Sequence, residues 1–346
     1  MAQVETAETG PDGASAEGGA RRRLRDVREW PELKRRLTDP GPWRRGLVVA
    51  ALAVLLGLVM LFHAHIPNRV GSLGSLTETF LPWAGLLLLP LMVAAVVRRS
   101  ASAVAALLLP VFVWLNLFGG LLTDKSSPER DLTVVTHNVA EQNTAYDATA
   151  RSLAASGADI LALQEITRGN RSAYEKALAA DYPYHAVLGT VGVWSKLPLS
   201  GTRPVDIKLG WTRALRTTVD TDHGPLALYV AHLPSVRVKL DAGFTAGRRD
   251  ASAQALGDAI GAEELDRVML LGDLNGTMND RALANITSQL RSAQGAAGDG
   301  FGFSFPAGFP MARIDQIMVR GVEPTNSWVL PATGSDHRPV GASVTF

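Results

Sequence analysis

The stretch Val268-Met-Leu-Leu-Gly-Asp-Leu-Asn275 decides the fold of the C-terminal part of the chain. Its first four residues form a short apolar run, which is typical of a buried strand. The polar residues Asp273 and Asn275 follow where that strand would end. Ligand sites in α/β proteins gather beyond the carboxyl ends of strands, so this pattern predicts functional side chains at a sheet edge.

Other candidate functional residues follow apolar runs, or lie within a strand pattern or a turn. These residues are Asn138 after Leu132–Val135, Gln164 and Glu165 after Ile160–Leu163, His232 after Leu226–Ala231, Asp315 inside Ile314–Val319, and Asp336 and His337 in a Gly-Ser-Asp-His turn. Each has an ordinary alternative, because an Asn can end a strand in an Asx-turn and a histidine can simply be packed. Their joint occurrence at strand ends favours one shared site.

Residues 131–346 alternate short strand patterns with helical ones, which predicts an α/β domain. At 216 residues this part is long enough to bury a core of its own. Further strands are expected at Val191–Trp194, Leu215–Val219 and Val268–Leu271, and helices at Asp147–Ser156, Arg171–Ala180, Arg248–Glu264 and Arg281–Gln289. A polar linker at 123–130 precedes the domain.

The composition excludes several classes of protein. Of the 346 residues, 47% are hydrophobic and 19% charged, which is too apolar for a disordered chain. The chain contains no cysteine, so it has neither disulfides, nor a thiolate nucleophile, nor a Cys-ligated metal. Residues 1–20 have no apolar periodicity and are expected to be disordered. Residues 21–45 are basic and lead directly into an apolar segment, which is typical of a basic segment beside a membrane. Residues 1–45 are therefore predicted to form a cytoplasmic tail.

Three uncharged stretches follow this tail within residues 46–122, at about 46–66, 80–97 and 101–122. A stretch of about 20 apolar residues crosses a bilayer at 1.5 Å per residue, so three transmembrane helices are expected. The tail and the Arg98-Arg99 turn carry most of the basic loop residues, whereas the loop from His63 to Thr79 has only Arg69. The excess of basic residues predicts a cytoplasmic N-terminus and an extracytoplasmic C-terminal domain.

The polar residues also indicate a type of chemistry. Oxygen donors from Glu165, Asn138, Asp273 and Asp336 suit Mg²⁺, or Mn²⁺ in its place. The domain has no G-x-S-x-G, H-E-x-x-H or P-loop motif. Histidines and carboxylates without a nucleophile motif favour metal-assisted hydrolysis.

Six motifs in order resemble the signatures of the endonuclease/exonuclease/phosphatase superfamily, whose members have a DNase I-like fold. They are Thr136-His-Asn-Val, Leu163-Gln-Glu, Ala231-His-Leu, Gly272-Asp-Leu-Asn, Arg313-Ile-Asp and Ser335-Asp-His. The resemblance covers 131–346 and implies a four-layer α/β sandwich. It also implies that Glu165, Asn138 and Asp336 bind the metal, that Asp273 and Asn275 orient water and phosphate, and that His337 paired with Asp315 is the general base or acid. His232 and Arg216 would bind the phosphate.

The substrate is predicted from topology and charge. Residues 131–346 are slightly acidic, which argues against nucleic acid as the partner. Three helices before such a domain resemble a family of membrane proteins linked to teicoplanin resistance. That resemblance implies an undecaprenyl pyrophosphate phosphatase acting on a lipid-linked pyrophosphate among membrane lipids. A membrane-tethered nuclease, a phospholipid phosphodiesterase and a non-catalytic binding module remain as alternatives, and the sequence says nothing of the oligomeric state.

The segment after His232 carries basic residues that could contact anionic groups. They are Arg237, Lys239, Arg248 and Arg249. A solvated loop and helix start is the simpler interpretation. Binding of the diphosphate or of anionic headgroups is the alternative.

Overall fold

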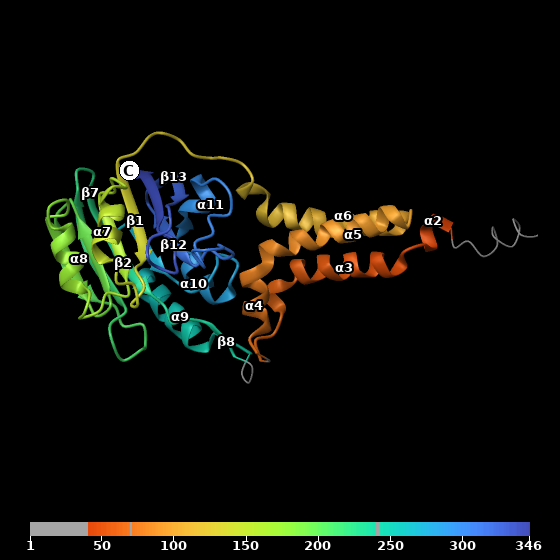
Figure 1. Cartoon of the computed structure of the whole chain (residues 1–346), viewed down its shortest axis with the longest axis horizontal. Helices are drawn as coiled ribbons and strands as arrows, with labels where there is room; N and C mark the ends of the chain where they lie inside the picture. Colours follow the sequence, from red (N-terminus) through yellow and green to blue (C-terminus); the bar gives the residue numbers. More distant parts are fainter. Residues whose placement is uncertain (1–40, 70, 240–242) are drawn as a thin grey trace, which may run out of the picture.

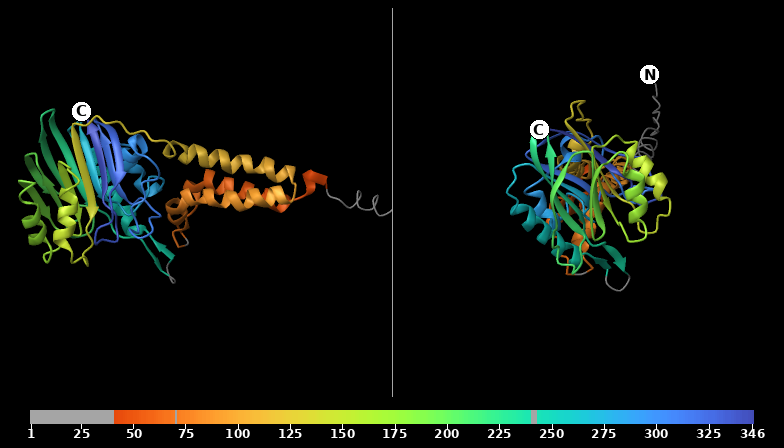
Figure 2. Two further views of the ribbon diagram at one scale, coloured as in Figure 1. Left: turned by 45° about the horizontal axis from the view of Figure 1, so that its top comes forward. Right: turned by 90° about the vertical axis from the view of Figure 1, so that its left-hand side faces the viewer.

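The computed structural model describes residues 41–69, 71–239 and 243–346 (Figure 1). The chain forms an α/β part and a bundle of apolar helices that projects from one end of it (Figures 1 and 2). The predicted disorder at 1–20 and most of the predicted basic tail lie outside the described residues.

Two six-stranded mixed sheets make up the α/β part. The first has the order β13 (Glu323–Val329), β14 (Val340–Thr345), β1 (Leu132–Asn138), β2 (Ile160–Gln164), β4 (Val191–Ser195) and β3 (Tyr184–Leu188). The second has the order β11 (Arg291–Ser292), β12 (Asp315–Arg320), β10 (Val268–Asp273), β7 (Gly224–His232), β6 (Ala214–Thr221) and β5 (Leu199–Pro204). Strands β1 and β2 run parallel, as do β7 and β10, so the carboxyl ends within each pair meet.

The strands alternate their side chains between two cores, as the period of two requires. In β10, Met269 and Leu271 contribute to the core between the two sheets, whereas Val268 and Leu270 face the helices. Helices α7 (Tyr146–Ala154) and α8 (Arg171–Leu178) cover the outer face of the first sheet. The second sheet is covered by α9 (Gly247–Gly261) and by η4 (Arg281–Leu283) with α10 (Ala284–Thr287). The predicted four-layer α/β sandwich is confirmed.

Smaller elements complete the α/β part. Strands β8 (Arg237–Lys239) and β9 (Gly243–Thr245) form a separate hairpin after β7, and α11 (Ala293–Ala297) follows β11. All seven predicted strands and three of the predicted helices are confirmed within a few residues. The helix expected at Arg281–Gln289 is divided into η4 and α10.

The bundle contains two helical spans that are long and apolar enough to cross a membrane, Leu73–Val97 and Ala101–Leu121. The first consists of α4 (Leu73–Phe80), η2 (Leu81–Leu87) and α5 (Leu88–Val97), and the second of α6 (Ala101–Phe118) and η3 (Gly119–Leu121). The predicted helix at 80–97 therefore begins earlier than expected. Within the predicted 46–66 helix, α3 (Leu47–Leu61) is apolar but only 15 residues long, and a 3₁₀ turn, η1 (His63–His65), follows it, so a third crossing stays a prediction.

Large apolar side chains cover the outside of the bundle. Among the described residues, all exposed large hydrophobic side chains lie within 43–122 except Tyr184, Trp211 and Phe309. A water-soluble protein rarely exposes so large a continuous apolar surface. This distribution supports contact with lipid.

The two ends of the bundle differ in character. At the end far from the α/β part, the turn between α5 and α6 lies beside α2 (Gly41–Arg44), and the Ser100 hydroxyl donates to the carbonyl of Arg45 (Figure 1). Arg98 and Arg99 lie in this turn. At the other end, α4 packs against the α/β part. The stretch from His63 to Thr79, expected to be a loop, is thus partly a helix that docks on the domain.

Candidate active site

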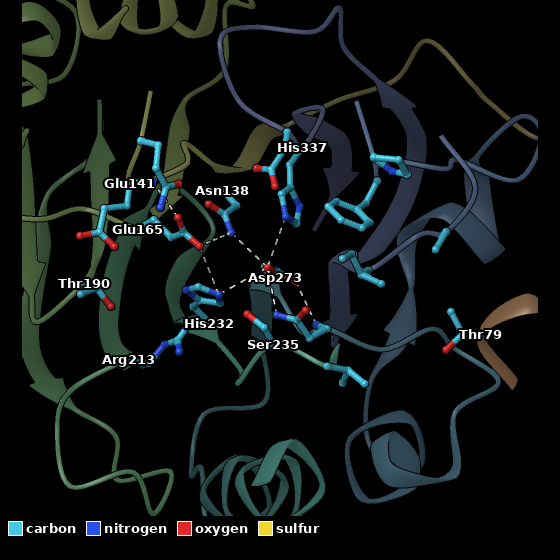
Figure 3. Close-up of a pocket in the computed structure, with 18 of the residues that line it drawn as sticks. Thr79, Asn138, Glu141, Glu165, Thr190, Arg213, His232, Ser235, Asp273 and His337 are labelled. Atoms are coloured by element: carbon cyan, nitrogen blue, oxygen red, sulfur yellow. Dashed lines mark hydrogen bonds and ion pairs between the residues drawn. The ribbon is translucent and has the colours of Figure 1, made fainter. Parts of the chain in front are cut away.

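Strand register brings the predicted polar residues to one edge of the sandwich. In the second sheet, Asp273 pairs with His232 on one side and with Asp315 on the other. In the first sheet, Asn138 pairs with Gln164, which directly precedes Glu165. Figure 3 shows Asn138, Glu165, His232 and His337 pointing toward Asp273.

A glycine is required directly before Asp273. Gly272 has a φ of +151°, and a Cβ atom there would lie 1.8 Å from the carbonyl oxygen of Ala231 on the neighbouring strand. Any side chain would therefore push β10 away from β7. The glycine keeps Asp273 and His232 at adjacent positions.

Asp273 is the buried centre of the site. Its Oδ2 accepts hydrogen bonds of 3.1 Å from the side-chain amides of Asn138 and Asn275, and its Oδ1 accepts one of 2.9 Å from the Asn275 backbone. The Nε2 atoms of His232 and His337 lie 3.5 Å and 3.8 Å from Asp273 Oδ2. Burial raises the pKa of Asp273 to about 7, although His337 opposes this shift.

Glu165 and Asn138 form one side of the pocket. The Asn138 amide nitrogen donates to Glu165 Oε1 at 3.1 Å as well as to Asp273, and the backbone N–H of Glu141 donates to Glu165 Oε2 at 2.7 Å. Glu165 and Asn275 have left-handed backbones, with φ of 62° and 46°. Such conformations cost about 1–3 kcal/mol each and cluster at functional sites.

His337 and Asp315 form the predicted pair. His337 Nδ1 lies 2.9 Å from Asp315 Oδ2, which also accepts a hydrogen bond of 2.6 Å from the Ser304 hydroxyl. Burial opposes a charge on His337, but Asp315 and Asp273 outweigh it and raise its pKa to about 10. The imidazole is therefore fixed in orientation and favours the protonated form.

His232 provides unpaired polar atoms inside the pocket. Neither ring nitrogen has a hydrogen-bond partner among the described residues, and the side chain is 3% exposed. Burial, Arg213 and His337 lower the pKa of His232 well below its usual range, so the ring is neutral. A buried nitrogen without a partner is costly, and a ligand oxygen would satisfy it.

The structure corrects the prediction for Arg216. This side chain does not line the pocket, because its guanidinium contacts the carboxylate of Glu263, in the segment after α9, at 2.9 Å and 3.0 Å. Arg213 lines the pocket instead, and its guanidinium Nε has no hydrogen-bond partner among the described residues. The pairing of the β6–β7 hairpin would have identified Arg213 as a pocket residue. This hairpin pairs Thr221 with Gly224 and Ala214 with Ala231, so Arg213 lies opposite His232.

Asp336 lines the pocket together with Glu165 and Asn138, the other two predicted metal ligands. The basic segment differs in part from expectation. Arg249 is buried and contacts Asp280 at 2.7 Å, and its Nη1 donates to the carbonyl of Asn275 at 2.6 Å. Arg249 thus supports the loop after Asp273 instead of contacting a ligand, and Arg237 and Lys239 lie on the β8 strand.

The pocket has a volume of about 610 Å³, and one of its walls comes from the helical bundle. Thr79 and Phe80 at the end of α4 line it together with Glu165, His232 and Asp273. Figure 3 shows Thr79 at the edge of this pocket. The remaining wall includes Trp211 and the segment from Phe305 to Ile314. No sequence pattern indicated that residues of the bundle would reach this site.

A polar contact fixes α4 against the α/β part. The fully buried Glu78 carboxylate lies 2.9 Å from Arg281 Nε, and the Thr277 hydroxyl donates to the carbonyl of Glu78 at 3.3 Å. Thr277 belongs to the loop that follows Asn275, and Arg281 begins η4 at the end of that loop. The end of α4 and the loop after Asp273 are therefore held together.

The donor set fits a hard divalent cation. The Asn138 amide nitrogen bridges the carboxylates of Glu165 and Asp273, so oxygen atoms converge on one side of the pocket. Asp273, Asp315 and His337 are also close enough to share an ion, but the Asp315 oxygens are already occupied by His337 and Ser304. Oxygen donors without sulfur suit Mg²⁺ or Mn²⁺, and Glu165 could hold one. Asn138 would join it only with its amide reversed, because its Oδ1 accepts from the Ala140 backbone N–H here.

A family model described as the endonuclease/exonuclease/phosphatase family matches residues 135–337, which is more than half of the chain. The chain belongs to this family. The match includes every residue assembled at the sheet edge, from Asn138 to His337. Endonuclease/exonuclease/phosphatase proteins are metal-dependent hydrolases of phosphate esters, and the carboxylates and histidines described above suit that chemistry.

Solved structures show the same fold at low identity. A mannosyl-6-phosphatase from Bacteroides thetaiotaomicron is 17% identical, with a TM-score of 0.52, over 62% of this chain and 100% of its own. TDP2 from D. rerio, in a humanized form, is 18% identical, with a TM-score of 0.52, over 62% and 99%. A family member from Beutenbergia cavernae is 19% identical, with a TM-score of 0.51, over 63% and 72%. No curated protein matches the chain.

Proposed function

We propose that this protein is a membrane-anchored phosphatase that hydrolyses undecaprenyl pyrophosphate outside the cytoplasm. The observation that carries the proposal is the pocket wall formed by Thr79 and Phe80. A bundle with an apolar exterior thus reaches the same pocket as the family's hydrolytic residues. A substrate with a phosphate headgroup and a hydrocarbon chain suits both.

Membrane topology supports the placement outside the cytoplasm. Two spans, Leu73–Val97 and Ala101–Leu121, are long enough to cross, and α3 is the proposed third. Arg98 and Arg99 lie at the end of the bundle far from the α/β part (Figure 1). Basic residues favour the cytoplasmic side, so the opposite end with the pocket would be extracytoplasmic.

The roles of the side chains follow from their positions. The neutral His232 and the cationic Arg213 would bind phosphate oxygens, and Asp273 with Asn275 would orient a water molecule toward the terminal phosphorus. The new P–O bond would form to that water as its proton passes to Asp273. The bond to the bridging oxygen would break as His337 donates its proton to the departing lipid phosphate. Mg²⁺ or Mn²⁺ held by Glu165 and Asn138, with Asp336 nearby, would offset the charge on the phosphoryl oxygens.

The biological role would be recycling of the lipid carrier of cell-wall synthesis. The proposed arrangement of three helices and an external hydrolase domain resembles the teicoplanin-resistance membrane protein VanJ. Removal of the terminal phosphate would regenerate the monophosphate carrier and reduce the effect of glycopeptides.

The test is phosphate release from undecaprenyl pyrophosphate by the full chain purified in detergent with Mg²⁺. Release that disappears with EDTA and in a His337→Ala variant would support the proposal. A parallel assay with plasmid DNA addresses the alternative of a tethered nuclease. Nicked DNA without phosphate release from the lipid would refute the phosphatase.

A further inference from the structure

A second cavity of about 390 Å³ lies where the bundle meets the α/β part. Its lining consists of apolar and aromatic side chains, from η2, α5 and α6 on one side and from the loop before β12 on the other. The residues are Pro82, Trp83, Gly85, Leu86, Leu88, Leu89, Trp114, Phe301 and Phe303. We call this cavity the apolar groove.

Trp83 separates the apolar groove from the catalytic pocket. Its ring stacks on Phe303 at 5.6 Å between centroids, and its Nε1–H donates to the carbonyl of Met311 at 2.8 Å. Met311 itself lines the catalytic pocket. One indole thus contacts residues of both cavities.

The loop before β12 also connects the two cavities. Phe303 lines the apolar groove, whereas Phe305 lines the catalytic pocket, with its ring 4.8 Å from that of His337. Two residues of extended chain span at most about 7 Å. Residues that line the two cavities therefore lie at most about 7 Å apart along this loop.

The apolar groove also reaches the outer surface of the bundle. Leu86 and Leu89 line it, and each is 55% exposed among the outward-facing apolar residues. A hydrocarbon chain could enter from the side without crossing water. The groove thus joins the proposed lipid-facing surface to the neighbourhood of His337.

We propose that the apolar groove binds the first part of the hydrocarbon chain of a lipid phosphate whose headgroup occupies the catalytic pocket. This inference rests on the proposed function and adds a binding site for the chain. Lipid tails are as apolar as leucine, so little hydrophobic gain is available inside a bilayer. The groove would act instead by orienting the phosphorus, where a misplacement of about 1 Å can cost 100-fold in rate.

A labelling experiment tests occupancy without relying on catalysis. The chain has no cysteine, so Leu86→Cys introduces a single thiol into the full-length protein. Leu87→Cys is the matched control, because Leu87 is the next residue, is 54% exposed and lies outside the groove lining. Both variants are labelled with a bimane reagent in detergent with Mg²⁺, alone, with a long-chain polyprenyl monophosphate, or with a five-carbon prenyl diphosphate.

We expect the long-chain monophosphate to slow labelling of the Leu86→Cys protein at least threefold and to leave the Leu87→Cys protein unchanged. The five-carbon compound should protect neither variant. Equal labelling rates of the Leu86→Cys protein with and without the long-chain compound would overturn the proposal. Equal slowing of both variants would overturn it as well, because it would indicate general coating by lipid.

Kinetics provide an independent measurement. Leu86→Trp would fill the groove and lower kcat/KM for the long-chain diphosphate about tenfold or more, while hydrolysis of the five-carbon diphosphate stays unchanged. Leu87→Trp should behave as the wild type with both substrates. Equal values for the two variants on the long-chain substrate would refute a role in orientation.

The two proposals fail in different ways. If the wild type releases phosphate but the Leu86→Cys protein is not protected, the groove proposal is wrong and the phosphatase stands. If the Leu86→Cys protein is protected but no phosphate is released, the groove proposal stands and the phosphatase is wrong.

Discussion

Loss of the buried Glu78 carboxylate should damage both stability and catalysis. Glu78 is fully buried and contacts Arg281 Nε at 2.9 Å, whereas Arg281 is 30% exposed and keeps a second hydrogen bond to the carbonyl of His63. Removing one partner of a buried pair costs about 3–5 kcal/mol. The partial exposure of Arg281 lowers this figure, so we expect about 2 kcal/mol for Glu78→Ala, or about 3 °C in Tm for a chain of 346 residues.

The same change should reach the active site. Thr79 and Phe80 follow Glu78 directly and line the pocket, and Arg281 begins η4, directly after the loop that follows Asp273. We expect kcat/KM for the long-chain substrate to fall about tenfold or more, because small displacements of reacting groups are costly.

Thermal unfolding in detergent and steady-state phosphate release measure the two effects. Thr77→Ala is the control, since Thr77 lies on the same helix but, among the described residues, its hydroxyl bonds only within α4, to the carbonyl of Leu73. A double variant, Glu78→Leu with Arg281→Met, removes both charges and should recover most of the lost stability. Wild-type Tm and activity in Glu78→Ala would refute the coupling of α4 to the catalytic loop.

Four further predictions concern the site and its support. Arg213→Ala should raise KM about tenfold or more through loss of a phosphate contact, whereas Arg216→Ala should lower Tm instead; kinetics and melting curves separate the two. Asp315→Asn should reduce kcat about 100-fold with little change in KM, because His337 loses the carboxylate that orients it; an unchanged kcat would contradict the pair. EDTA should abolish activity and Mg²⁺ or Mn²⁺ restore it, so hydrolysis that persists in EDTA would exclude the proposed metal. Burial opposes the charge of Glu263, but hydrogen bonds from Arg216 hold its pKa at about 2, below its usual 4.5. The wild type should therefore lose stability as pH falls from about 4.5 to 2. Melting curves measured against pH should show that Glu263→Gln lacks this loss.

The sequence predicted those parts of the fold that depend on local periodicity. Strands β1, β2, β7 and β10 are continuous apolar runs because they are buried on both faces, and their polar ends are visible in the sequence. The edge strand β5, Leu199–Pro204, has no such run, because it is mostly exposed and contains glycine and proline. It was therefore missed.

The errors at the site arose from contacts between distant residues. The family resemblance implies a phosphate-binding role for Arg216, but a strand alternates its faces, and Glu263, two residues after α9, binds the guanidinium on the outer face of the sheet. Arg213 sits one position before β6 and becomes visible only once the hairpin register is known. The docking of α4 depends on Glu78 and Arg281, which are about 200 residues apart in the sequence.

The shared wall of the catalytic pocket has a practical consequence. A soluble fragment that starts after the helices would lack Thr79 and Phe80, so its pocket would be open on one side. Substrate or inhibitor screens on such a fragment would sample a different cavity from that of the intact protein. The helical bundle and the α/β part are for the same reason poor candidates for exchange between homologues, because each supplies part of a single cavity.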